Sequence, residues 1–299
     1  MRRPIRSLSC AIALALCSLL AASSQAAQVY WVSLHPSDDS PSANAASAGF
    51  TQAPDVGYTD LLTANGHTVT RYVSTATPDA ALLNAADLVI VSRSVPSSHY
   101  QSAGATAWNS ITAPVILLNG YLLRSSRLGY TTGTTIPDIA GTVSLAVNNP
   151  SHPVFAGIAL DASDTMVNPY ANIVTFMGTA ERGISVNTNP LAGGGTVLAT
   201  IGTAGDPAFG GMTIGEWNAG SVLGNGTADI LGGHRLALLT GSREHSGLTS
   251  EGAGIYDLTA DGAQIFLNAV NYMAVPEPSS IALLAFGGLS LALRPRRKA

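Results

Sequence analysis

Cysteine is nearly absent from this sequence, and the two cysteines that it has stand close to the amino terminus. Cys10 and Cys17 fall inside a segment that we expect to be cleaved off, which leaves a mature chain without any thiol. A protein without thiols has no disulfide, no thiolate metal site and no cysteine nucleophile. The chemistry of the mature chain must therefore come from other side chains.

The expected cleavage rests on residues 1–26, which have the parts of a secretory signal peptide. The positive region holds Arg2, Arg3 and Arg6. An apolar run over residues 11–22 follows, and Ser24-Gln25-Ala26 fits the small-x-small pattern of a cleavage site. We predict that the mature chain begins near Ala27. An uncleaved membrane anchor is the alternative, but the run is shorter than the roughly 20 residues that a spanning helix needs.

Lysine is also missing from the body of the chain. Between Ala27 and Glu277 there are seven arginines and 18 acidic residues, a net charge of −11, whereas the other seven of the 14 basic residues lie in the leader and at the carboxyl tip. Such an acidic body argues against nucleic acid and anionic lipid as partners. It is typical of a solvated extracytoplasmic protein.

Two common catalytic motifs do not occur. The chain has no Gly-x-Ser-x-Gly nucleophile elbow and no His-Glu-x-x-His zinc helix. The stretch Gly224–Gly233 resembles a calcium-binding nonapeptide repeat, but it occurs once and an extra residue precedes Asp229. We therefore interpret it as a glycine-rich loop. No period of 20 to 50 residues recurs, which excludes a solenoid or a propeller.

The apolar pattern that is present predicts alternating strands and helices. Strands are predicted over residues 28–34, 67–73, 87–92, 114–119, 195–202, 211–217 and 234–240. Helices are predicted over residues 54–64, 78–85 and 103–111, and a closing helix capped by Thr259 presents Ile265, Phe266, Ala269, Val270 and Met273 on its apolar face. This order predicts a parallel sheet covered on both faces. Residues 131–194 have weak periodicity, and we leave them open as an insertion within the sheet or a small subdomain.

Five segments of the body carry a family resemblance: "ADLVIVSRS", "APVILLNGYLL", "SHPVFAGI", "GHRLALLTG" and "LTADGAQIFLNAVNYM". Together they resemble the class I glutamine amidotransferase-like superfamily, particularly its trehalose-utilisation-like branch. The resemblance implies an α/β fold for residues 27–274, a flavodoxin-like three-layer sandwich with a mostly parallel central sheet. In catalytic members the strand that matches "PVILLN" leads into an elbow with a cysteine. This chain has Tyr121 there, and because a phenol without an adjacent base is a poor nucleophile, we expect no amidotransferase activity.

The carboxyl-terminal segment, residues 275–299, has three features in a fixed order. Pro276-Glu277-Pro278 comes first, an apolar run over residues 279–293 follows, and the tip is basic with Arg294, Arg296, Arg297 and Lys298. The apolar run is long enough for roughly 22 Å of helix. That is short for a hydrocarbon core of roughly 30 Å, but workable as a transmembrane helix when flanking arginines reach the interface. A buried helix is the alternative, but four cations directly after the run do not suit a core.

These three features closely resemble the PEP-CTERM sorting signal of Gram-negative bacteria that make extracellular polysaccharide. The resemblance implies that a membrane-embedded exosortase recognises Pro276, Glu277 and Pro278 and cleaves close to them. It also implies a precursor anchored in the inner membrane that is later released or transferred to the cell surface. Two prolines keep the segment extended, as a protease-like enzyme prefers its substrate.

In open parallel sheets, ligands bind beyond the carboxyl ends of the strands. Residues that follow the predicted strands are therefore candidates for a ligand crevice: His35, Asp38, Asp39, Arg93, Tyr121, Arg124, Glu216, Trp217, Arg243 and His245, with His99 and Glu244 beside them. Histidines and carboxylates could hold a divalent metal there, whereas Trp217 and Tyr121 could stack on a sugar. Ordinary polar loop residues are the third interpretation. No catalytic residue and no cofactor is assigned.

Two functions follow as hypotheses. The first is an exported, exosortase-processed protein of the cell surface or extracellular matrix, whose body has a binding or structural role linked to exopolysaccharide. Its partners would be the secretion machinery, exosortase, the inner membrane in transit and extracellular polysaccharide, but no nucleic acid. The second is a carbohydrate-active hydrolase or isomerase that uses His35, Asp39, Glu216 and His245. Grouping of these four side chains would favour the second function.

Overall fold

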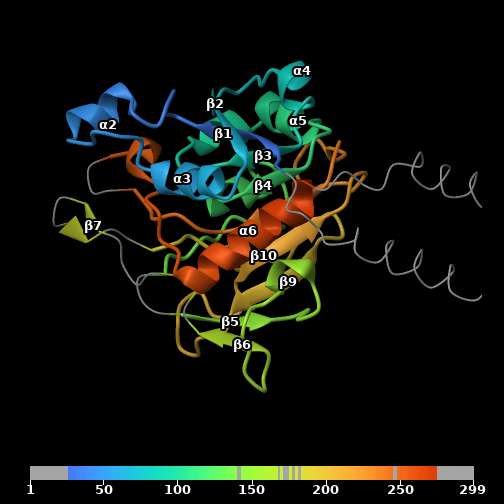
Figure 1. Ribbon diagram of the computed structural model, residues 1–299. Helices are drawn as coiled ribbons and strands as arrows, with labels where there is room; N and C mark the ends of the chain where they lie inside the picture. Colours follow the sequence, from blue (N-terminus) through green and yellow to red (C-terminus); the bar gives the residue numbers. More distant parts are fainter. Residues whose placement is uncertain are drawn as a thin grey trace, which may run out of the picture.

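A computed structural model of the chain describes residues 26–139, 143–167, 169–170, 175–176, 179–180, 183–244 and 248–274. A nine-stranded sheet runs through the molecule in the order β2-β1-β3-β4-β11-β10-β9-β5-β6 (Figure 1). A separate two-stranded ribbon is formed by β7 (Thr175–Phe176) and β8 (Thr179–Ala180). Residues 1–25 of the predicted leader, which covers 1–26, and the predicted span, 279–293, lie outside the described residues.

One half of the sheet is parallel, as the order of the elements predicts. It contains β2 (Thr68–Val73), β1 (Gln28–Ser33), β3 (Leu88–Val91), β4 (Val115–Leu117) and β11 (Arg235–Leu238). All of their mutual pairings are parallel. Every residue of β3 and β4 is buried, which explains why their sequences are continuous apolar runs instead of alternating ones.

The other half of the sheet is antiparallel, and the sheet as a whole is therefore mixed. It contains β10 (Met212–Trp217), β9 (Thr196–Ile201), β5 (Ser144–Val147) and β6 (Thr165–Val167). Strand β10 runs antiparallel to β11, and each later neighbour reverses direction again. Strands β5 and β6 come from the region that the sequence left without a prediction, and their pairing with β9 places them in the main sheet.

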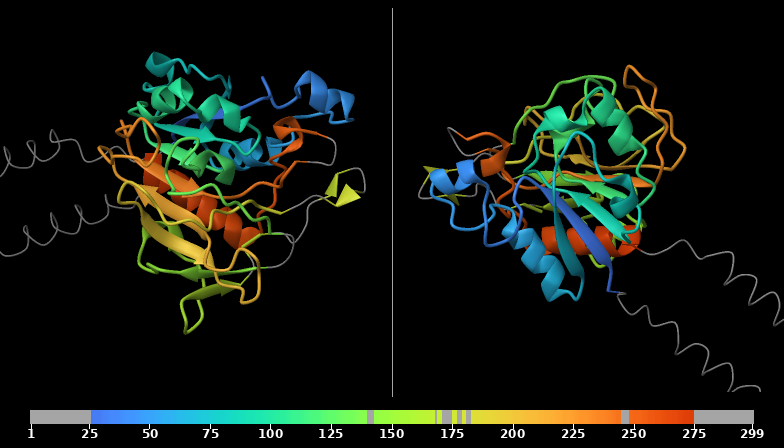
Figure 2. Two further views of the ribbon diagram at one scale, coloured as in Figure 1. Left: turned by 180° about the vertical axis from the view of Figure 1, so that it is seen from behind. Right: turned by 90° about the horizontal axis from the view of Figure 1, so that it is seen from above.

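Helices cover both faces of the parallel half (Figure 2). On one face lie α3 (Val56–Ala64) and α6 (Ala260–Ala274), and α6 contacts β3, β4 and β11. On the other face lies α5 (Ala103–Asn109), whose Trp108 packs on Tyr72 of β2. The shorter helices are α2 (Ala43–Ser47) and α4 (Ala80–Leu83). This arrangement gives three layers in the parallel half.

In the described part of the chain, four short 3-10 helices lie in the connections: η2 (Ser97–Tyr100), η3 (Gly120–Leu123), η4 (Pro153–Phe155) and η5 (Ser250–Gly252). Helix η3 follows β4 directly and η5 lies beside α2, so both stand at the carboxyl ends of the parallel strands. Helix η4 contacts α6.

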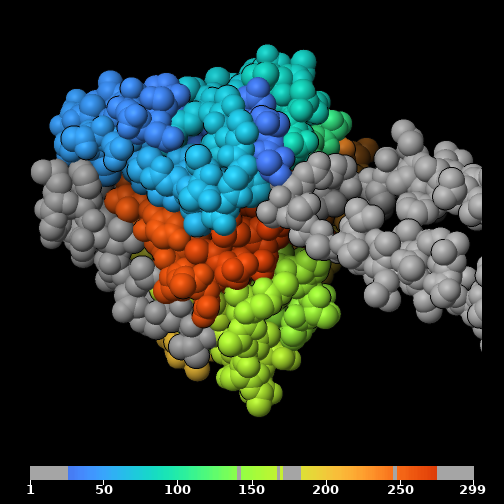
Figure 3. All heavy atoms as spheres, in the orientation of Figure 1, coloured from blue at the N-terminus to red at the C-terminus, as the bar shows by residue number. Residues whose placement is uncertain are grey.

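The core confirms the predicted apolar face of α6. Ile265, Phe266, Ala269, Val270 and Met273 are all buried. The opposite side of α6 forms part of the molecular surface between α3 and the β5–β6 strands (Figure 3). No helix within the described ranges is long and apolar enough to cross a membrane.

Candidate functional site

The carboxyl ends of β1, β3, β4 and β11 meet at one edge of the sheet because these strands are parallel. We call this the carboxyl edge, and the opposite one the amino edge. Seven of the predicted candidates follow these four strands: His35, Asp38, Asp39, Arg93, Tyr121, Arg124 and Arg243. His245 lies outside the described residues. The side chains at this edge form two polar networks.

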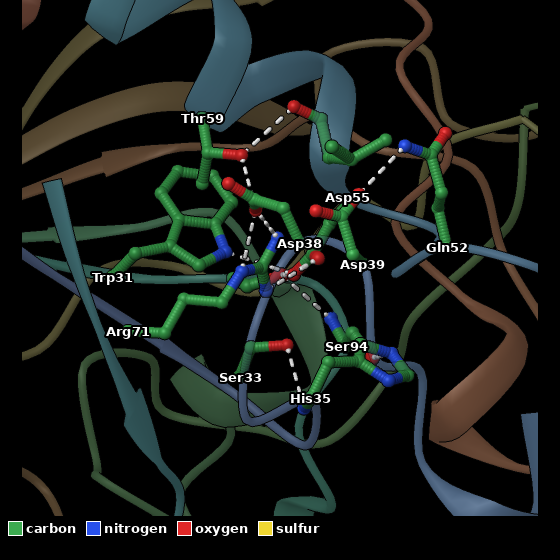
Figure 4. Close-up of polar contacts among 12 residues, drawn as sticks. Trp31, Ser33, His35, Asp38, Asp39, Gln52, Asp55, Thr59, Arg71 and Ser94 are labelled. Carbon is green, nitrogen blue, oxygen red and sulfur yellow. Dashed lines mark hydrogen bonds and ion pairs between the residues drawn. The ribbon is translucent and has the colours of Figure 1, made fainter.

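The first network is centred on Asp55, the fully buried residue before α3 (Figure 4). Its carboxylate accepts hydrogen bonds from Trp31 Nε1 at 2.8 Å and from the Ser92 hydroxyl at 2.6 Å, and it pairs with Arg71 Nη1 at 2.9 Å. Burial by itself would raise the pKa of Asp55, but the Arg71 charge and these hydrogen bonds lower it below its ordinary value. Asp55 is therefore a charged anchor that joins α3 to β1, β2 and β3.

Asp38 and Asp39 have different surroundings. Asp38 accepts from Arg71 Nε and from the Thr59 hydroxyl, each at 2.7 Å, so it extends the Asp55 network. Asp39 accepts from exposed Gln52 at 3.2 Å (Figure 4). Asp38 thus holds its loop against α3 and β2, whereas Asp39 contacts a residue of a neighbouring loop.

His35 is fully buried and both of its ring nitrogens are occupied. Nδ1 accepts from the Ser42 N–H at 3.0 Å, and Nε2 lies 2.9 Å from the Ser94 hydroxyl. Since that hydroxyl donates to the Ser250 carbonyl at 2.9 Å, it accepts from a protonated Nε2. Burial lowers the pKa of His35. A neutral imidazole with two partners fastens three loops together and leaves no lone pair for a metal.

The second network surrounds Tyr121, which lies in the first turn of η3 directly after β4. The Asn119 side chain accepts from the Tyr121 N–H at 3.0 Å. Gly120 is required before it, because a β-carbon there would lie 2.3 Å from the Ser185 carbonyl oxygen. Tyr121 has no positive φ angle, and so lacks the strained backbone of a nucleophile elbow.

Three guanidinium groups surround the Tyr121 ring. Their central carbons lie 5.1 Å from the ring centre for Arg93, 5.0 Å for Arg124 and 5.4 Å for Arg243, within the range of cation–π contact. These contacts make the Tyr121 ring an aromatic platform for cations.

Two carboxylates neutralise part of this positive charge. Glu244 pairs with Arg93 at 3.2 Å and with Arg243 at 2.9 Å, and Arg243 also pairs with Asp138. Burial would raise the pKa of Glu244, but the charges of Arg93 and Arg243 lower it. Arg93 is itself buried, and that burial lowers its pKa. This network joins the segments that follow β3, β4 and β11.

Glu216 and Trp217 do not join the other candidates. They end β10, which runs antiparallel to β11, so the carboxyl end of β10 lies at the amino edge, where Trp217 pairs with Arg235. Trp217 is also buried, and its indole N–H donates to the Ala192 carbonyl at 2.8 Å. The expectation of one shared crevice is therefore wrong for these two residues. That expectation assumed that all strands of the sheet run parallel.

At the amino edge, Glu216 belongs to a cluster that the sequence analysis did not anticipate. His152 Nε2 lies 3.6 Å from its carboxylate, His234 Nε2 lies 3.3 Å away, and the Tyr272 hydroxyl donates at 3.2 Å. The neighbouring His152 and His234 side chains lower the pKa of Glu216, and burial raises the pKa of Tyr272 to about 12. The members come from four distant segments, so no local pattern could have grouped them.

A divalent metal site was one of three interpretations of the candidate residues. Among the described residues, no three histidines or carboxylates are arranged to hold a metal ion. His99 stands apart from the others, with Nδ1 3.1 Å from the Ser74 hydroxyl. In the amino-edge cluster, His152 Nδ1 accepts from the Val154 N–H at 3.3 Å, which places the ring proton on Nε2, toward Glu216.

The loop Gly224–Gly233 is held together by its own side chains. Asp229 accepts from Asn225 at 2.6 Å, from Thr227 at 2.6 Å and from Thr106 of α5 at 2.9 Å. With donors on both oxygens, the carboxylate fixes the loop against α5. This arrangement supports the interpretation as a glycine-rich loop over that of a calcium site.

Comparison with known proteins identifies the end of the chain. Residues 274–298 match the PEP-CTERM protein-sorting motif, which confirms the motif predicted from Pro276-Glu277-Pro278. No curated protein sequence matches the chain.

Among solved structures, the chain is similar to a cytoplasmic protein from Salmonella typhimurium, with a TM-score of 0.48 and 11% identity over 82% of this chain and 98% of the other. It is also similar to a ThuA-like protein from Bacteroides uniformis, with a TM-score of 0.46 and 13% identity over 85% of this chain and 92% of the other. At this level of similarity, we infer nothing about function from either structure.

Proposed function

We propose that this protein is exported, cleaved by an exosortase near its carboxyl terminus, and retained at the cell surface or in the extracellular matrix of a Gram-negative bacterium. The observation that carries this proposal is the PEP-CTERM match over residues 274–298. The predicted leader over residues 1–26, the predicted inner-membrane span over 279–293 and the basic tip are what such a route requires.

The fold supports this route by placing both ends of the described chain at the amino edge. Gln28, the first residue of β1, donates to Asp87 at 2.8 Å, and Asp87 lines the same groove as Met273 and Ala274 at the end of α6. Figure 2 shows these two ends on one side of the molecule. A body tethered through residue 275 would therefore point its carboxyl edge away from the attachment.

We propose further that the body, residues 27–274, is amidotransferase-like in fold and serves binding without amide hydrolysis. By the resemblance, Tyr121 stands where catalytic members of the superfamily have cysteine, and its ring contacts three arginines. The alternative of a carbohydrate hydrolase or isomerase needed His35, Asp39, Glu216 and His245 together. His35 lies at the carboxyl edge and Glu216 at the amino edge, so the described geometry does not favour it.

The test is the intact mass of the protein recovered from its host, with and without exosortase. We expect loss of residues 1–26 in both strains and loss of the segment after about Pro276 only where exosortase is present. A Pro276→Ala/Pro278→Ala double variant should keep its tail, whereas the exposed loop variant Pro207→Ala should be processed like the natural protein. A tail of equal mass in both strains would overturn the proposal.

A further inference from the structure

Basic residues are scarce in the body, yet they gather at the carboxyl edge. Four of its seven arginines belong to the network around Tyr121 and its continuation: Arg93, Arg124, Arg127 and Arg243. The carboxylates paired with them are Glu244 and Asp138, so this network has a net charge of +2 in a body of −11. A concentration of like charge on an otherwise acidic protein focuses its potential on that place.

The positive charge is least compensated at Arg124 and Arg127. Arg124 donates to the Tyr121 carbonyl at 2.9 Å and to the Ser97 hydroxyl at 3.1 Å. Arg127 donates to the same hydroxyl at 3.3 Å and to the Ser126 carbonyl at 2.9 Å. These partners are neutral, and burial together with the Arg127 charge lowers the pKa of Arg124. Two adjacent guanidinium groups thus share one hydroxyl group.

Donors also exceed acceptors deeper in the network. The Arg93 side chain is 2% exposed, and its Nε has no hydrogen-bond partner within the described residues. Buried polar atoms almost always have a partner, and one that lacks it calls for an explanation.

A cavity of about 400 Å³ borders the network. Arg127 lines it together with Ser102, Ser125, Ser126, Asn225 and Thr227. Hydroxyl and amide groups around one guanidinium group suit a ligand that carries several hydroxyls and one anionic end. Guanidinium groups bind carboxylates and phosphates through paired N–H donors.

We propose that this cavity binds a sugar acid, with the carboxylate held by Arg127 and the hydroxyls facing the serine and threonine side chains. Arg124 shares the Ser97 hydroxyl with Arg127, so its charge, together with those of Arg93 and Arg243 around Tyr121, adds to the positive field near the cavity. The inference deepens the proposed binding role of the body and rests on it. Ligand binding tests this inference, whereas the intact mass tests export and processing. Either proposal can therefore fail without the other.

The test is isothermal titration calorimetry on the full chain in nonionic detergent micelles at low ionic strength. The probes are galacturonate, its uncharged counterpart galactose, and inorganic phosphate. We expect saturable binding of galacturonate that weakens with added salt, and at least about tenfold weaker binding of galactose and of phosphate. Absence of saturable galacturonate binding, or equal binding of galactose, would overturn the proposal. Phosphate binding as tightly as galacturonate would overturn the assignment to a sugar acid.

The variants separate a specific site from general electrostatics. Arg127→Gln should weaken galacturonate binding about tenfold or more, because a charge-assisted hydrogen bond is lost. Gln264→Glu, on the exposed side of α6, changes the net charge by the same amount and should bind like the natural protein. If Arg127→Gln is not folded by circular dichroism, Arg127→Lys, which keeps the charge but loses the paired N–H donors, should also weaken binding. Unchanged binding in a folded arginine variant would contradict the proposal.

Discussion

At the scale of single residues, buried charges in this protein are distributed between two edges of one sheet. Asp55 is fully buried, and Arg71, whose side chain is 5% exposed, compensates it. Glu216 is 19% exposed and depends on two histidines and a tyrosine. In both places the charged form is held by hydrogen bonds from distant segments, so the protonation state of one residue affects the packing of several elements.

Glu216 gives a prediction about acid stability. The neighbouring His152 and His234 side chains depress its pKa in the folded state, so the charged carboxylate stabilises the protein above its ordinary pKa of about 4.3. That contribution is lost as the pH falls through the depressed folded-state pKa. Glu216→Gln should therefore lower the free energy of unfolding by about 1–3 kcal/mol at pH 7. The difference should shrink progressively below about pH 4.

Urea unfolding at pH 7 and at pH 3, followed by tryptophan fluorescence, would measure both effects. Asp60→Asn, an exposed position on α3, is the matched control and should change stability little at either pH. A Glu216→Gln variant as stable as the natural protein at pH 7 would show that the amino-edge cluster does not stabilise the fold.

At the scale of elements, the turn between β4 and η3 decides what the carboxyl edge can present. Gly120 lets the chain pass close to Ser185, and Asn119 caps the next residue, so Tyr121 is delivered to the arginines in a fixed orientation. The Asn119 side-chain amide also donates to the Arg93 carbonyl at 3.2 Å, which ties the ends of β3 and β4 together. The short turn therefore fixes Tyr121 after β4 and holds the end of β3 beside it.

This turn yields a second prediction. Gly120→Ala would place a β-carbon 2.3 Å from a backbone carbonyl oxygen, so the backbone must shift. We expect a loss of about 1–3 kcal/mol in the free energy of unfolding. Gly226→Ala is the matched control, because nothing lies within 4 Å of its β-carbon position and its φ angle is not positive. Thermal or urea unfolding measures the stability of both variants. A Gly120→Ala variant as stable as Gly226→Ala would contradict the steric argument.

At the scale of the whole molecule, the sheet combines a buried parallel half with an antiparallel extension. Strand β3 is fully buried and has partners on both sides, whereas β2 is the outermost strand of its half and no residue in it is buried. Stability should therefore be unevenly distributed. Local opening at the edges exposes little apolar surface, but opening of the centre requires the core to separate.

Amide hydrogen exchange of the full chain measures this distribution. We expect the amides of β3, Leu88–Val91, to exchange at least about tenfold more slowly than those of β2, Thr68–Val73. Both strands pair in parallel with β1, so the comparison is between a central and an outermost strand of the same half of the sheet. Exchange in β3 as fast as in β2 would mean that the parallel half opens as one unit.

Much of the fold could be predicted because the relevant signals are local. The apolar run of β3 and the periodic face of α6 each lie within a few consecutive residues, and both appear in the structure where they were expected. Strands β5 and β6 were not predicted, because they are short and join the main sheet only through the pairing of β5 with β9, which is distant in the sequence. Their regularity arises from the sheet that they join.

The sequence by itself determined the sorting motif at residues 274–298, the absence of a thiol from the body and the alternation of strands and helices in the parallel half. Only the tertiary structure decided which candidates meet. Because β10 runs antiparallel to β11, Glu216 lies at the amino edge. The tertiary fold also places Arg93, Arg124 and Arg243 around Tyr121. The physical reason is that strand direction and side-chain grouping depend on pairings between distant segments, whose energies appear only once the whole sheet has formed.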